Sequence, residues 1–122
     1  MSAIGYKNHK VLIGILTNAW HPKLLEVLLW LTVRYSTIIF TSAYRPHKIH
    51  SDDSGIHSTI PLRAFDLRSR VFSDPQKIAD DINAHFIYDP ARPNLNLNVY
   101  HDTGQGHHFH IQVHPRTDYR TL

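Results

Sequence analysis

The sequence contains no cysteine, which excludes disulfide bonds and thiolate metal sites. Any transition metal that the chain holds must therefore be bound by His, Asp or Glu. The sequence also has no long apolar run. Its most apolar stretch, residues 24–33, contains Glu26 and is well short of the ~20 residues that a membrane-spanning helix needs. Histidine, in contrast, is abundant, with eleven residues.

Length and composition predict one folded domain over residues 1–122. Hydrophobic residues make up 42% and charged residues 19% of the chain, which is typical of a globular rather than a disordered protein. The formal net charge of +3 is compatible with an anionic partner, such as nucleic acid or a bacterial wall polymer, without identifying one. Lys7 and Lys10 precede a short apolar patch that no cleavage motif follows. We therefore expect synthesis in a cytoplasm without a signal peptide.

Apolar periodicity and turn residues predict the order β-α-β-loop-β-α-β-β. The expected strands cover residues 11–16, 36–44, 63–69, 94–101 and 108–114, the helices lie within residues 18–36 and 73–86, and a long loop covers residues 45–61. Ser73 and Gln76 have the spacing of a capping box at the start of the second helix. The predicted fold class is α+β, a small, mainly antiparallel sheet with two helices packed on one face.

Five of the eleven histidines lie between His101 and His114, where polar and apolar residues alternate. A strand that buries its apolar residues, from Phe109 onward, must present His108 and His110 together on its other face. Two imidazoles on one face can contribute to a single small site. The alternative interpretation is a solvated polar face that needs no metal.

Asp66 favours the metal site. It lies between Phe65 and Leu67 in an apolar strand and points to the face opposite theirs. A carboxylate in such surroundings is unfavourable unless it is paired, hydrogen-bonded or bound to a metal. His57, Asp66 and His110 together would supply two imidazoles and one carboxylate, which leaves a fourth position for water as in catalytic zinc sites. We therefore expect Zn²⁺ as the cofactor, bound by these three residues.

The segments that carry these residues resemble the zinc peptidases of the LAS superfamily, which includes lysostaphin-type enzymes, D-Ala-D-Ala metallopeptidases and hedgehog domains. They are SAYRP at 42–46, SGIH at 54–57 with RAFD at 63–66, and GHHFHIQ at 106–112. The sequence is most similar to phage endolysin peptidases and penicillin-insensitive murein endopeptidases. The resemblance covers about residues 42–113. It implies a hedgehog/DD-peptidase-like fold and hydrolysis of an amide bond in the stem peptide of bacterial peptidoglycan.

The resemblance also implies roles for individual residues. His57 and Asp66 match the paired zinc ligands of the family, although the spacing between them is two residues longer than usual, and His110 matches the third ligand. Arg45 matches the arginine that contacts the substrate carboxylate or the oxyanion. His107 stands where the carboxypeptidase branch has its catalytic Glu, whereas His108 matches the first His of the H-x-H pair in the other branches. Strand alternation favours His108.

Three further residues are candidates for supporting roles. Asp102 and Gln112 are polar residues close to the H-x-H pair and are candidates to orient a ligand imidazole. His101 is either structural or a further residue of this kind.

Two alternatives remain open at this point. The domain could bind zinc and recognise wall peptide or a protein partner without hydrolysis. Residues 57–59 and 101–103 also fit the H-x-T motif of two-histidine phosphoesterases, which need no metal. The main hypothesis is a zinc-dependent, endolysin-like endopeptidase or carboxypeptidase, a monomer that acts on peptidoglycan at the bacterial cell wall and has no nucleic-acid partner and no membrane span.

Overall fold

The computed structural model describes residues 3–44, 55–102 and 106–120, which form an α+β fold around a mostly antiparallel, five-stranded sheet. The strand order is β1-β2-β3-β6-β5, and β1 pairs with β2 in parallel whereas the other pairs are antiparallel. These strands are β1 (Ala3–Tyr6), β2 (Thr37–Ser42), β3 (Ala64–Arg68), β5 (Asn98–Asp102) and β6 (His107–Gln112). The short strands β4 (Phe86–Ile87) and β7 (Asp118–Tyr119) form a separate antiparallel pair.

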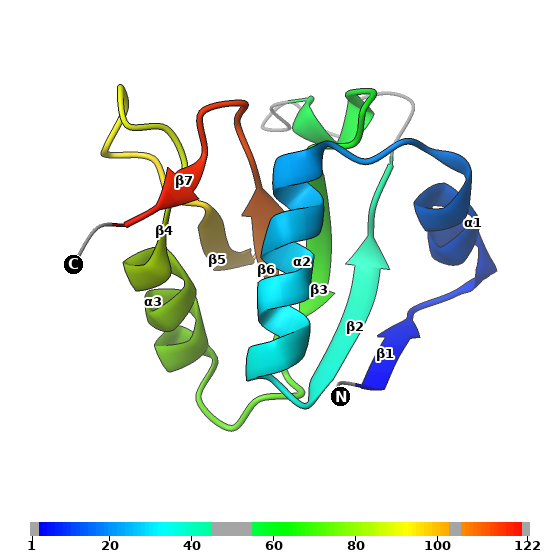
Figure 1. The fold of residues 1–122 in the computed structure, drawn as a ribbon. Helices are drawn as coiled ribbons and strands as arrows, with labels where there is room; N and C mark the ends of the chain where they lie inside the picture. The colour runs from blue at the N-terminus through cyan, green and yellow to red at the C-terminus, as the bar shows by residue number, and fades with distance from the viewer. Residues whose placement is uncertain (1–2, 45–54, 103–105, 121–122) are drawn as a thin grey trace.

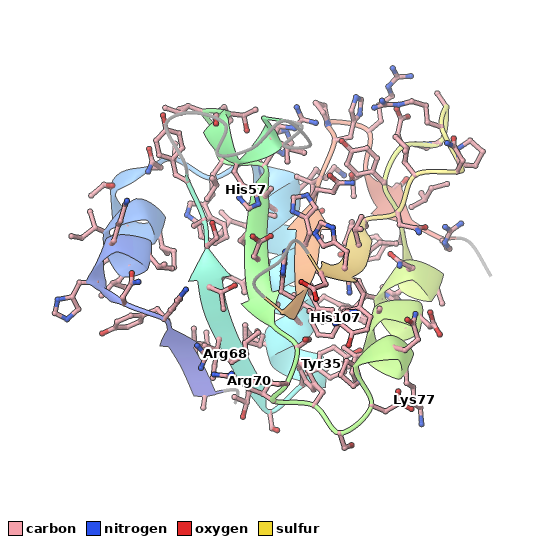
Figure 2. All side chains as sticks on the ribbon, turned by 180° about the vertical axis from the view of Figure 1, so that it is seen from behind. Tyr35, His57, Arg68, Arg70, Lys77 and His107 are labelled. Carbon is pink, nitrogen blue, oxygen red and sulfur yellow. The ribbon has the colours of Figure 1, made fainter. Side chains whose placement is uncertain are left out.

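Three α-helices occur among the described residues, one more than the sequence predicts. They are α1 (His9–Thr17), α2 (Pro22–Arg34) and α3 (Pro75–His85), and a short 3-10 helix, η1 (Ile56–Ser58), precedes β3. Figure 1 shows α2 lying across one face of the sheet, α3 beside it at the β5 end, and α1 at the β1–β2 end. In the reverse view of Figure 2 the sheet lies in front of α2, so its second face is turned toward the viewer.

The core fills the space between the sheet and the helices α2 and α3. Its buried members include Leu24, Val27 and Leu31 of α2, Ile82 of α3, Phe65 and Leu67 of β3, and Phe109 and Ile111 of β6. Burying a side chain of this size contributes roughly 1.5–3 kcal/mol relative to leaving it exposed. The alternation in β3 and β6 therefore fixes which face each residue takes, because a slip of one residue would expose the apolar set.

The strand predicted at residues 11–16 is wrong, since these residues belong to α1. Asn8 caps this helix by accepting a hydrogen bond from the Val11 amide, 3.0 Å away. A short continuous apolar run fits a buried strand and a packed helix equally well by periodicity. The cap is the local feature that selects the helix here. The first strand instead is β1, a four-residue stretch too short for the pattern to reveal.

Two boundaries also differ from the predictions. Asp74, not Ser73, is the N-cap of α3, and its carboxylate accepts a hydrogen bond from the Lys77 amide at 3.2 Å. Gln76 donates to Asp80 at 2.9 Å rather than completing a capping box. The strand expected from residue 94 begins at Asn98.

None of the helices in the described parts of the chain is long and apolar enough to cross a membrane.

Candidate metal centre

Strand register places Asp66 and His110 side by side on the sheet face away from α2. The two residues are direct partners in the antiparallel β3–β6 pair, and the next partners on that face are Arg68 and His108. Directly opposite residues of an antiparallel pair project to the same side of the sheet. The alternation that buries Phe109 therefore brings the carboxylate and both imidazoles of the H-x-H pair to one surface, as predicted.

His57 joins this pair from η1. Gly55, which precedes η1, has a φ of 83°, in the left-handed region that glycine adopts without steric strain. The His57 side chain is almost fully buried, and Figure 2 shows it beside β3, at the opposite end of the β3–β6 pair from His107. Its Nδ1–H donates to the Ala43 carbonyl oxygen at 2.7 Å, which turns Nε2 toward the sheet.

Three ligand atoms converge at this point. His57 Nε2 lies 3.2 Å from Asp66 Oδ1 and 3.2 Å from His110 Nδ1, and His110 Nδ1 lies 3.1 Å from Asp66 Oδ1. Among the described residues, this is the one group whose ligand atoms already lie close enough together to hold a metal ion, all within 4.8 Å of one another. Its members are the three residues that the sequence predicts.

The surrounding hydrogen bonds show that all three converging atoms carry lone pairs when the imidazoles are neutral. The Gln112 amide nitrogen donates to the Asn96 carbonyl oxygen at 2.9 Å, so its Oε1 is the atom that faces His110 Nε2 at 3.0 Å. His110 Nε2 must therefore carry the hydrogen, and its Nδ1 a lone pair. For His57 the Ala43 carbonyl can only accept, so Nδ1 carries the hydrogen and Nε2 the lone pair.

Three lone pairs facing one another repel unless a cation or protons lie between them. Burial raises the pKa of Asp66, but the facing imidazoles of His110 and His57, when protonated, donate hydrogen bonds and positive charge to the carboxylate and hold that pKa well below its ordinary value. The carboxylate is therefore ionised at neutral pH. A divalent cation can bind the carboxylate and both neutral imidazoles at once. Two added protons could bridge the same atoms only by making both rings positively charged.

The donor set fits zinc. Atoms bound at about 2.0–2.1 Å around a tetrahedral zinc stand roughly 3.3 Å apart, close to the separations of 3.1 and 3.2 Å found here. Two imidazoles and a carboxylate suit a borderline metal, whereas Mg²⁺ and Ca²⁺ prefer oxygen ligands. Both remote ring hydrogens are donated to carbonyl-type oxygens, as ligand imidazoles in metal sites require.

His108 and His107 occupy opposite faces of β6, as alternation predicts. His108 Nε2 lies 3.9 Å from Asp66 Oδ2, at the edge of the cluster and partly exposed. The His107 ring packs instead against Tyr100, 5.1 Å between centroids, on the face that carries Phe109. His101 is the register partner of His108, with ring centroids 4.7 Å apart, so it belongs to the face of the candidate site.

The remaining candidates have mixed outcomes. Gln112 contacts a ligand imidazole, as the sequence suggests, whereas Asp102 accepts a hydrogen bond from the Gly106 amide. Arg45 lies outside the described residues. Sequence reasoning missed the carbonyls of Ala43 and Asn96, because a backbone acceptor carries no side-chain signal.

Comparison of the chain with protein-family models, curated proteins and solved structures found no match.

Proposed function

We propose that the protein is a zinc-dependent peptidoglycan peptidase of the endolysin type. The observation that supports this most strongly is the convergence of His57 Nε2, Asp66 Oδ1 and His110 Nδ1, three lone-pair atoms within 3.2 Å of one another on one sheet face. The resemblance to LAS-superfamily peptidases supplies the substrate class and the hedgehog/DD-peptidase-like fold. The net charge of +3 agrees in sign with an anionic wall substrate.

Each residue of the site would have its own role in this hydrolysis. His57, Asp66 and His110 would hold the zinc, which when bound supplies a Lewis acid that polarises the scissile carbonyl and acidifies a water. His108, partly exposed and 3.9 Å from Asp66 Oδ2, is placed to take a proton at Nε2 and return it to the leaving amine. Arg45 would hold a substrate carboxylate or the oxyanion.

The arrangement of residues 57–59 argues against the two-histidine phosphoesterase alternative. That class needs both H-x-T motifs on paired strands. His57 lies in η1, and in the described sheet β5, which carries His101, pairs with β6. The cluster around Asp66 favours a metal site instead.

Hydrolysis separates the peptidase from the zinc-containing binding module. The test is to incubate purified peptidoglycan with the zinc-loaded protein and to measure newly released amino groups, with His108→Ala as the matched variant. We expect turnover by the parent protein and almost none by the variant. A parent protein that contains stoichiometric zinc, binds the wall material and releases no amino groups over a range of peptidoglycan types would support the binding module and contradict the peptidase.

A further inference from the structure

A second pair of imidazoles lies beside the His57–Asp66–His110 cluster. His101 of β5 and His108 of β6 are direct partners across the antiparallel pair, and their rings are 4.7 Å apart between centroids. Both side chains are partly exposed. Asp66 connects this pair to the first cluster, because its Oδ1 faces His57 and His110 whereas its Oδ2 lies 3.9 Å from His108 Nε2.

We propose that His101, His108 and Asp66 Oδ2 form a second divalent-metal site that shares the Asp66 carboxylate with the first. Directly opposite residues of an antiparallel pair have Cβ atoms about 4.5–5.5 Å apart, so two imidazoles at such positions can reach one ion. A carboxylate can bind a different ion through each oxygen, and two-metal sites hold their ions about 3.5–4 Å apart. Imidazole and carboxylate ligands suit Zn²⁺, Co²⁺ and Ni²⁺.

Binding at this second site requires only side-chain motion. The His101 and His108 rings must turn until one nitrogen of each faces Asp66 Oδ2, and partly exposed side chains change rotamer readily. The β5–β6 backbone does not need to move, because the register already places the two residues opposite each other.

The second ion should bind more weakly than the first. Both ions would share one negative charge, and Arg68, the β3 partner of His108, places a positive charge on the same face. Like charges a few ångströms apart repel strongly near a protein surface, so we expect a dissociation constant at least about tenfold higher. If the proposed peptidase function holds, the second ion would also occupy His108, the proton carrier. Excess zinc would then inhibit the enzyme.

Metal binding itself is the primary test, so the result does not depend on catalysis. The metal-free full chain is titrated with Co²⁺ and with Zn²⁺ in equilibrium dialysis, and the bound metal per chain is measured. We expect one ion at low free metal and a second at higher free metal. His101→Ala and the more conservative His101→Asn should bind one ion. His107→Ala, on the same strand but the opposite face, should still bind two. Circular dichroism confirms that each variant folds.

The possible results of the titration distinguish the second metal site from the first. A parent protein that saturates at one ion up to millimolar free metal would overturn the second site and leave the first intact. A second ion that persists in both His101 variants would also overturn it, since the ion would then lie elsewhere. A parent protein that binds no metal would refute both sites.

Discussion

At the scale of single residues, the positions of two hydrogens prepare the site for a cation. His57 donates its Nδ1–H to Ala43, and His110 donates its Nε2–H to Gln112. Each ring is thereby held in the tautomer whose other nitrogen faces Asp66. Without those two acceptors the rings could present a hydrogen to the carboxylate and close the site by hydrogen bonding.

Gln112 gives the first prediction at this scale. Gln112→Leu removes the acceptor of the His110 Nε2–H and frees the ring to change tautomer and orientation. Loss of such a supporting contact typically lowers metal affinity by ~10–100-fold. Zinc affinity measured by competition with a chromophoric chelator should show this loss, whereas His107→Ala should bind as the parent does. Unchanged affinity in Gln112→Leu would mean that the ring is oriented by other contacts.

His108 and His107 give the second prediction. Loss of a general base typically lowers the rate by ~10²–10⁴-fold, so His108→Ala should be almost inactive on peptidoglycan and yet contain zinc. His107→Ala should keep most of its activity, because its ring packs against Tyr100 on the other face of the strand. Zinc content and amino-group release are measured for both variants. The reverse ranking would support the carboxypeptidase assignment of His107.

At the scale of elements, the sheet shows how far a pattern in the sequence determines the geometry. The alternation in residues 108–114 predicts the faces of Phe109 and His110 correctly, because the apolar set has only one face on which it can be buried. The same reasoning places Asp66 on the site face. These predictions are correct because each concerns a strand that large apolar side chains bury on one face.

Elements that depend on local capping or on pairing were less predictable. The apolar residues 11–16 carry no feature that separates a strand from a helix, and the choice is made by the Asn8 cap and by packing against the sheet. The pairing of His101 with His108 depends on the register between β5 and β6, which the sequence alone does not determine. The sequence alone therefore does not separate a structural His101 from one that lies beside the site.

The start of α3 provides a prediction with a built-in control. Asp74→Ala removes the side chain that caps the Lys77 amide, and loss of such a cap lowers the free energy of unfolding by about 1 kcal/mol. Ser73→Ala, at the neighbouring position that the sequence pattern favours, should change it by less than ~0.5 kcal/mol. Urea denaturation of the two variants measures both values. A larger effect of Ser73→Ala would support a capping box formed by Ser73 and Gln76 and would contradict Asp74 as the cap.

At the scale of the whole molecule, the His57–Asp66–His110 metal site brings together segments that are far apart in the sequence. Its ligands come from η1, β3 and β6, so a bound ion links segments that separate on unfolding. An ion that binds the folded chain alone stabilises it by mass action, by about 2.7 kcal/mol at a free concentration of 100 times Kd. Stability and metal content should therefore change together.

Chelation tests this link. Removing the metal should lower the melting temperature by roughly 10 °C for a domain of this size. Zinc should restore it, and His110→Ala should melt at the same temperature with and without chelator. The measurement is differential scanning calorimetry of both proteins. An equal effect of the chelator on the parent and on His110→Ala would place the stabilising ion at another site.

We propose that one zinc, held by His57, Asp66 and His110, makes this domain a peptidoglycan peptidase. The most direct measurement is the rate of amino-group release from purified peptidoglycan as metal-free protein is titrated with zinc. We expect no activity without metal, a maximum near one zinc per chain, and no activity in His110→Ala at that ratio. Full activity in the metal-free protein, or in His110→Ala, would contradict it.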